Sequence, residues 1–137
     1  LDDGRTLAQS NAILLYLGEG SALIPDDLYT RAQINEWLFW EQYSHEPYIA
    51  VCHSQVVNDG KSFDELEPWR VERGNAALAR MEAHLQDRDW FVGGAMTVAD
   101  IAMFAYTRVA YKAGFDMAPH TAVAAWLDRC STALKPD

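Results

Sequence analysis

The dipeptide Gln9-Ser10 stands where a short helix is predicted to begin. The first N–H groups of a helix have no intrahelical partners and lie at the positive end of its dipole. Together with the hydroxyl group of Ser10, they would suit a carboxylate or a phosphate. Alternatively, Ser10 only caps the helix, which contributes about 1 kcal/mol to stability. The spacing leaves both interpretations open.

A second polar pair, Thr97 and Asp100, has the spacing of a helix-capping box. In such a box the Thr97 side chain accepts the N–H of Asp100, and the Asp100 carboxylate accepts the N–H of Thr97. Met96 and Ile101 occupy the two positions of the hydrophobic staple that accompanies the box. We therefore predict that this pair positions the following helix and takes no part in catalysis.

Polar and aromatic residues interrupt an otherwise apolar helix over the run Glu41-Gln42-Tyr43-Ser44-His45-Glu46-Pro47-Tyr48. Buried polar groups need partners, and such a cluster beside the bend expected at Pro47 can line a cleft. The alternative is that Glu41 and Glu46 face the solvent while His45 is a hydrogen-bonded core residue. Both interpretations remain open.

Other kinds of chemistry find no support in the sequence. The histidines are too scattered to form a metal site, and Gly93-Gly94 lacks the lysine of a phosphate-binding loop. Cys52 and His53 are adjacent and face different directions on a helix, so they do not form a catalytic pair. We therefore predict no metal site. The four histidines are His45, His53, His84 and His120.

The spacing of apolar residues predicts that the elements which position these residues are almost all helices. The Asp3-Gly4 dipeptide favours a tight turn, so residues 1–7 are predicted to form a short strand and turn. A helix over Ser10–Leu17 follows, and residues 21–27 form a linker. From Leu28 the apolar residues lie on two stripes, which is typical of a central helix packed on more than one side.

Three further helices are predicted, and no strand pattern follows Leu7, so we predict an all-α fold. The first follows the capping-box spacing of Ser62–Glu65, the second begins after Thr97 and ends at Gly114, and the third begins near Thr121. Gly74 in the first would let a neighbouring backbone approach closely. The predicted inward residues are Val71, Leu78, Met81 and Leu85, then Ile101, Phe104, Ala105 and Val109, then Val123, Leu127, Cys130 and Leu134.

Composition excludes several classes of partner. The chain has 137 residues, half of them apolar, and a formal net charge of -9. Such an acidic balance opposes binding to nucleic acid and to anionic membranes. No apolar run approaches the ~20 residues of a membrane-spanning helix. Cys52 and Cys130 are too few for a disulfide scaffold, and we expect a cytoplasmic protein.

The order of these motifs resembles that of cytosolic glutathione S-transferases of the bacterial type. Residues 7–17, LAQSNAILLYL, resemble the end of the family's thioredoxin-like domain, where an acidic or amide residue followed by Ser begins a helix. Residues 37–47, 94–101 and 123–127 resemble the family's fourth helix, its capping box and its penultimate helix. In place of the proline that often precedes that penultimate helix, this chain has Thr121, which can cap it.

The resemblance implies a helical bundle, residues 28–137, that is the C-terminal domain of a glutathione transferase. Residues 1–20 would be the residual strand and helix of the thioredoxin-like glutathione-binding domain. Gln9 and Ser10 would hold the γ-glutamyl end of glutathione, which is a co-substrate, and no cofactor is implied. The residue that activates the thiol would lie upstream of Leu1. The implied pocket for a small hydrophobic electrophile comprises Tyr43, Ser44, His45, Tyr48, Tyr106 and Arg108.

Two functions remain compatible with these observations. The first is part of a transferase that adds the glutathione thiolate to electrophiles. The second is a non-catalytic interaction or assembly domain of the same fold, which would have no need for Gln9 and Ser10. Without a complete thioredoxin-like domain, apolar residues such as Ile13 and Leu17 would be exposed. We therefore expect a homodimer or a higher oligomer.

Overall fold

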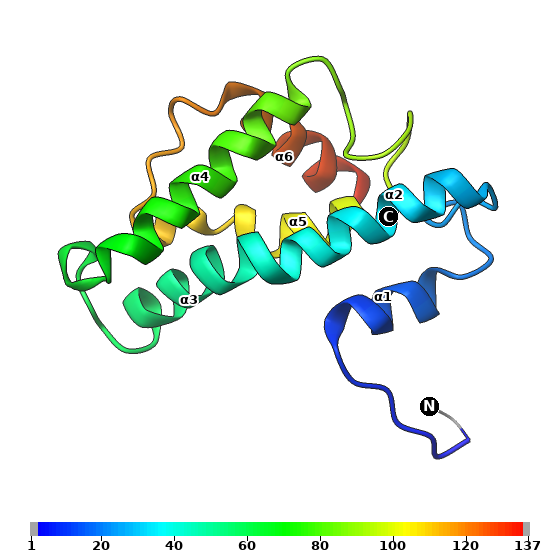
Figure 1. Ribbon diagram of the computed structural model, residues 1–137, viewed down its shortest axis with the longest axis horizontal. Helices are drawn as coiled ribbons and strands as arrows, with labels where there is room; N and C mark the ends of the chain where they lie inside the picture. Colours follow the sequence, from blue (N-terminus) through cyan, green and yellow to red (C-terminus); the bar gives the residue numbers. More distant parts are fainter. Residues whose placement is uncertain (1–2, 136–137) are drawn as a thin grey trace.

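Helices form all the regular structure of the computed structural model, which describes residues 3–135 (Figure 1). The all-α prediction is therefore confirmed. Three of the elements are short or irregular: one π-helical turn and two 3-10 turns. In chain order the elements are α1 (Ser10–Gly18), α2 (Leu28–Trp40), η1 (Glu41–His45, the π turn), α3 (Glu46–Val57), η2 (Phe63–Glu65), α4 (Pro68–Leu85), α5 (Val98–Thr107), η3 (Ala110–Ala113) and α6 (Thr121–Ala133).

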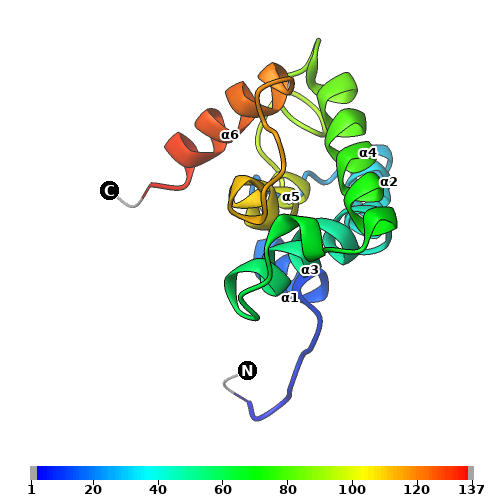
Figure 2. The same cartoon turned by 90° about the vertical axis from the view of Figure 1, so that its left-hand side faces the viewer.

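The strand predicted near the N-terminus is absent from residues 3–8. The turn is present, with Gly4 at φ 81°, and an ion pair joins Arg5 to Asp3 across it. Both views show this segment running away from the helices (Figures 1 and 2). A strand needs a partner strand for its hydrogen bonds, and the described residues supply none. Leu1 and Asp2, which belong to the same prediction, lie outside the described residues.

The long central helix is interrupted by the π turn η1, which ends two residues before Pro47. Proline has no N–H to donate and disfavours a regular helix interior. The turn accommodates it, because the N–H of Glu46 donates to the carbonyl of Glu41, five residues earlier, and Pro47 becomes the second residue of α3. The irregularity predicted at Pro47 is thus a π turn, a feature that is frequent at functional sites.

Two apolar clusters form the core. The larger lies among α2, α4, α5 and α6, with Trp126, Ile34, Met81 and Met103 buried in it. The smaller joins α3, α4 and η3. Gly74 makes room for a side chain and not for the neighbouring backbone that was predicted, because a Cβ atom at this position would lie 2.5 Å from the ring of Phe115. The buried members of the smaller cluster are Ile49, Cys52, Leu66, Ala77, Leu78, Ala110, Ala113 and Phe115.

The inward faces of the last two helices differ from the prediction. In α5, Ala105 was predicted to face inward but is exposed. The prediction failed because this short helix is packed on several sides, so its apolar spacing does not single out one buried face. In α6 the core residue Trp126 was not predicted, while the predicted Leu134 is exposed and follows the end of the helix. The buried residues of α5 are Val98, Ala99, Asp100, Ala102, Met103 and Thr107.

The helix starts also depart from the prediction in two places. The capping box of Ser62 and Glu65 is present, but it closes the 3-10 turn η2, and α4 begins at Pro68. Thr121 is the first residue of α6 and not its cap. Instead, the carboxylate of Glu82 on α4 accepts the N–H groups of Ala122 and Val123, each at 3.0 Å.

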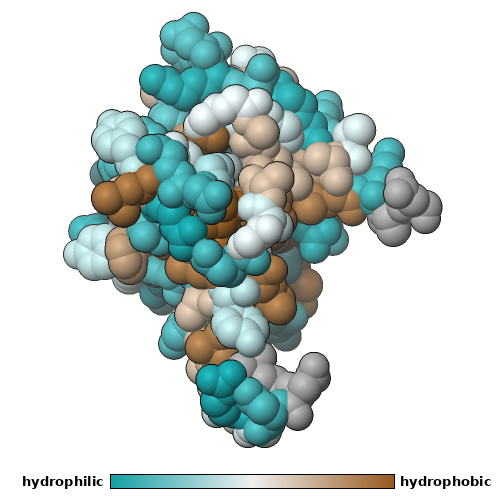
Figure 3. All heavy atoms as spheres, turned by 90° about the vertical axis from the view of Figure 1, so that its right-hand side faces the viewer, coloured by the Kyte–Doolittle hydropathy of each residue, from teal (hydrophilic) through white to brown (hydrophobic). Residues whose placement is uncertain are grey.

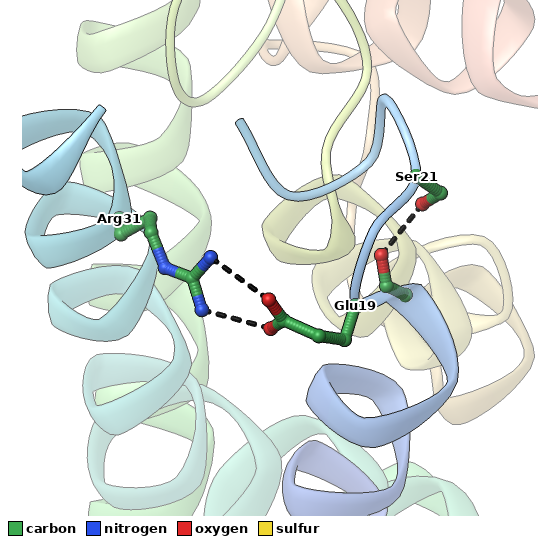
Figure 4. A network of polar contacts seen from close by, with 4 residues as sticks. Glu19, Ser21 and Arg31 are labelled. Carbon is green, nitrogen blue, oxygen red and sulfur yellow. Dashed lines mark hydrogen bonds and ion pairs between the residues drawn. The ribbon is translucent and has the colours of Figure 1, made fainter. Parts of the chain in front are cut away.

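The short helix α1 is held against α5 and the start of η1. The Asn11 side chain donates to the Leu38 carbonyl at 3.0 Å, and Gly18 lies against Val98. At its C-terminal end, Glu19 forms a two-bonded ion pair with Arg31 of α2, and Ser21 donates to the Gly18 carbonyl (Figure 4). These contacts fix the first helix on the bundle.

Candidate functional site

Backbone strain marks the residue that precedes α1. Gln9 has φ 72° and ψ 120°, and it is the only non-glycine residue with positive φ within residues 3–135. Such a conformation costs of order 1–3 kcal/mol and is typical of ligand-binding positions. Gln9 occupies the N-cap position and makes no side-chain cap, while Ser10 is the first helical residue. The interpretation of Ser10 as an N-cap is therefore wrong, and no side chain makes a capping hydrogen bond at this end of the helix.

A cleft of about 410 Å³ opens beside Ser10. Its lining includes three polar residues, Ser10, Asn11 and Glu41, together with Tyr106 and apolar side chains of α1 and α5. An apolar cleft with a few convergent polar groups is the usual form of a small-molecule site. The remaining lining residues are Ile13, Leu14, Ile101, Ala102 and Ala105.

A second cleft, of about 240 Å³, lies on the other side of α1 and includes Gln9. Asn11 borders both clefts, so the start of α1 separates them. Most of the residues that line this second cleft are apolar or uncharged. Its other residues are Ala12, Leu15, Asn35, Leu38, Phe39 and Gln42.

Glu41 is a carboxylate that is almost enclosed, with 3% of its surface exposed. Its Oε2 atom accepts hydrogen bonds from the Asn11 amide at 3.1 Å and the Gln42 amide at 2.7 Å. Burial raises its pKa, the two amides lower it, and the nearby charge of Glu46 raises it further, with a net upward shift. The sequence alternative that placed Glu41 on a solvated face is wrong.

The six residues assigned to an electrophile pocket do not come together. Tyr106 borders the cleft beside Ser10, while Ser44 and Tyr48 line a separate cleft of about 240 Å³ between the central helix and α4. Tyr43 points to the solvent, with 77% of its surface exposed. Arg108 is also exposed, and its guanidinium group lies 5.6 Å from the centre of the Phe104 ring.

His45, the remaining member of that set, is completely buried, contrary to a pocket position. Thr107 Oγ1 donates to the Met103 carbonyl at 2.7 Å, so it accepts from His45 Nε2 at 2.8 Å. Burial lowers the pKa of His45 to about 4. The alternative interpretation of His45 as a hydrogen-bonded core residue is therefore the correct one, although its Nδ1 atom has no partner.

The predicted capping box of Thr97 and Asp100 is present, and Asp100 does more than the spacing indicated. Its Oδ2 atom accepts the Thr97 N–H at 2.9 Å. Its Oδ1 atom accepts the Phe91 N–H and the Trp126 indole N–H, each at 3.0 Å. One buried carboxylate therefore joins the turn before α5, the start of α5 and the middle of α6.

Among residues 3–135, no three His, Cys, Asp or Glu side chains converge in a way that could hold a metal ion. No helix in the same part of the chain is both long enough and apolar enough to cross a membrane.

The helical bundle and the start of α1 are what the resemblance to glutathione S-transferases implies, and comparisons with known sequences lead to the same family. The profile of the glutathione S-transferase C-terminal domain matches residues 41–133. The chain belongs to this family. Glutathione S-transferase D7 of Anopheles gambiae is 27% identical in an alignment that covers 98% of this chain and 62% of that protein. The disulfide-bond oxidoreductase YfcG of Escherichia coli K12 is 27% identical over 90% of this chain and 58% of that protein.

Solved structures of bacterial glutathione S-transferases are more similar. The protein from Xanthobacter autotrophicus Py2 has 46% identity and a TM-score of 0.89, over 99% of this chain and 66% of that chain. The protein from Pseudomonas fluorescens Pf-5 has 41% identity and the same TM-score, over 94% and 65%. This chain therefore spans just under two thirds of the length of these relatives.

Proposed function

We propose that this chain is part of a glutathione transferase, which conjugates the glutathione thiolate to small hydrophobic electrophiles. In this proposal Gln9 and Ser10 bind the γ-glutamyl end of glutathione. The observation that carries it is the strained Gln9, which leads into a helix start without a side-chain cap, beside a cleft lined by a few polar and several apolar side chains. A non-catalytic assembly domain that binds no ligand at α1 would gain nothing from a strained residue at this position.

The chemistry requires a thiolate, because the thiol itself is a poor nucleophile. We propose that the activating residue lies in the part that the relatives have upstream. The apolar side chains that line the cleft, with Tyr106, then supply a surface for the electrophile. Tyr43, Ser44, Tyr48 and Arg108 stay candidates for contacts that the upstream part would complete.

The domain limits belong to the same proposal. Residues 1–20 are the end of a thioredoxin-like domain, residues 21–27 are the linker, and residues 28–137 are the helical domain. The exposed apolar side chains of Ile13, Tyr16 and Leu17 support a further domain that packs on α1. We propose a cytoplasmic homodimer with a role in detoxification.

The experiment that tests the function uses this chain and a form extended upstream to the length of the relatives. We expect glutathione conjugation to a model aromatic electrophile only in the extended form, and glutathione binding in calorimetry to weaken when Ser10 is replaced by Ala. Loss of one charge-assisted hydrogen bond predicts a roughly 10-fold weaker affinity. If neither form binds or conjugates glutathione, the non-catalytic assembly domain is the better explanation, and the exposed face of α1 would be its contact surface.

A further inference from the structure

We propose that the cleft between the central helix and α4 binds a small phosphate monoester, and that Arg73 and Arg80 of α4 contact its phosphate group. This cleft, of about 240 Å³, is the one that Ser44 and Tyr48 line. Among residues 3–135, no residue borders both this cleft and the cleft beside Ser10. A ligand here would therefore be separate from the proposed glutathione site.

The first support is the charge of the lining. Arg73 and Arg80 are the only charged residues among the described residues that border the cleft, in a chain whose formal net charge is -9. They are two helical turns apart on α4 and so lie on the same face. None of the ion pairs among residues 3–135 involves either of them. Two guanidinium groups without carboxylate partners match the charge of a dianion, and their planar fork suits phosphate oxygens.

The second support is the set of hydrogen-bond donors that remain unused. Arg80 makes no hydrogen bond to any residue that the structure describes. Arg73 donates to the Tyr48 hydroxyl at 3.0 Å, so the phenolic O–H itself stays available as a donor. The Ser44 hydroxyl also has no partner among residues 3–135. A phosphate group, with three strong acceptor oxygens, can use several such donors at once.

The third support is the way in which neighbouring rings hold the two guanidinium groups. That of Arg80 lies 4.8 Å from the centre of the Trp40 ring and 5.2 Å from that of Trp37. That of Arg73 lies 5.6 Å from the centre of the Tyr48 ring. Contact with a ring face does not consume the N–H donors, which lie in the plane of the guanidinium group. Groups that are already held in position lose less entropy when a ligand binds.

The rest of the lining suits the organic part of a phosphate ester. Ala76 and Ala77 lie between the two arginines in the sequence and border the cleft with small apolar side chains. The Trp40 indole borders it from the central helix. A ligand with an apolar group beside its phosphate, such as phenyl phosphate, matches this combination of polar and apolar groups.

The test is calorimetry on the extended form with phenyl phosphate and with benzoate, at about pH 8, where the phosphate monoester is a dianion and benzoate a monoanion. We expect phenyl phosphate to bind at least about 10-fold more tightly than benzoate. Arg73→Gln and Arg80→Gln should each weaken the binding of phenyl phosphate by roughly 10-fold, because each removes a charge-assisted contact. Both side chains are exposed, so the fold should persist, as circular dichroism would show.

The matched control is Arg88→Gln, which removes another exposed arginine that forms no ion pair with the described residues and does not border this cleft. It should change the affinity for phenyl phosphate by less than about 2-fold. Equal effects of the three substitutions would reveal a general charge effect and overturn the phosphate site. Equal binding of phenyl phosphate and benzoate would overturn it as well.

A last measurement separates this cleft from the proposed glutathione site. Saturating glutathione should leave the affinity for phenyl phosphate unchanged within about 2-fold, because the two clefts share no lining residue. Competition between the two ligands would place the phosphate beside Ser10 and overturn the inference. If glutathione itself does not bind, the proposed function fails, and the arginine variants still decide whether the phosphate site exists.

Discussion

Asp100 stabilises the fold through three N–H donors that lie far apart in the sequence. Because the carboxylate is completely buried, these donors cannot find water if it is removed. We predict that Asp100→Ala lowers the free energy of unfolding by about 3–5 kcal/mol, more than the ~1–2 kcal/mol of an ordinary cap. Urea unfolding measures it. The control is Asp87→Ala at an exposed position, and an equal effect of both would contradict the structure.

His45 predicts a specific dependence of stability on pH. Its folded pKa is about 4 and its ordinary value is 6.5, so the unfolded state takes up a proton first as the pH falls. The stabilisation from neutral His45 is complete above pH 6.5 and is lost between pH 6.5 and 4. From pH 7 to 5, the wild type should lose about 2 kcal/mol more than His45→Gln, which can still donate to Thr107.

The measurement is the free energy of unfolding in urea at several pH values for both proteins. Both carry His53, His84 and His120, so the effects of these three residues cancel in the difference. Parallel curves for the two proteins would show that His45 does not titrate in this way.

At the scale of the element, α6 depends on a cap supplied by another helix. The Glu82 carboxylate accepts two N–H groups at the start of α6, next to the positive end of its dipole. We predict that Glu82→Ala costs about 1–2 kcal/mol and speeds hydrogen exchange at the first amides of α6. Thr121→Ala, at the residue that the sequence predicted as the cap, should cost less than about 0.5 kcal/mol. If Thr121→Ala cost more stability than Glu82→Ala, Thr121 would be the residue that caps α6.

Local patterns predicted the elements well, because a cap, a turn or a periodic stripe involves residues within a few positions of each other. The start of α1, the box at Thr97 and the interruption at Pro47 are all of this kind. The apolar spacing failed in α5, where burial on several sides removes the contrast between faces that periodicity needs.

Contacts between distant residues decided the rest of the site. The Thr107 partner of His45 lies 62 positions away, and Glu82 lies 40 positions from the amide it caps. Glu41 is buried because α1 packs above it and Asn11, 30 positions earlier, holds its carboxylate. No periodic pattern within the central helix carries this information, so the sequence could only leave the burial of Glu41 and His45 open.

At the scale of the whole molecule, an acidic chain carries an uncovered apolar face. Leu17 is 71% exposed and Tyr16 50%, beside Ile13 on α1, and Figure 3 shows apolar residues on the face that includes this region. Exposed apolar surface favours association, while the net charge of -9 opposes it through repulsion. Salt screens that repulsion, with a Debye length of about 10 Å at 0.1 M and 3 Å at 1 M.

We therefore predict that this chain forms a dimer or a higher oligomer at micromolar concentration, and that added salt strengthens the association. Sedimentation velocity at two salt concentrations measures both effects. Leu17→Glu should shift the chain toward the monomer, since it places a charge in the apolar face. Val57→Glu alters another exposed apolar residue, on α3, and should leave the distribution unchanged. A wild-type monomer, or equal effects of the two substitutions, would show that the α1 face does not drive association and would weaken the case for a domain that covers it.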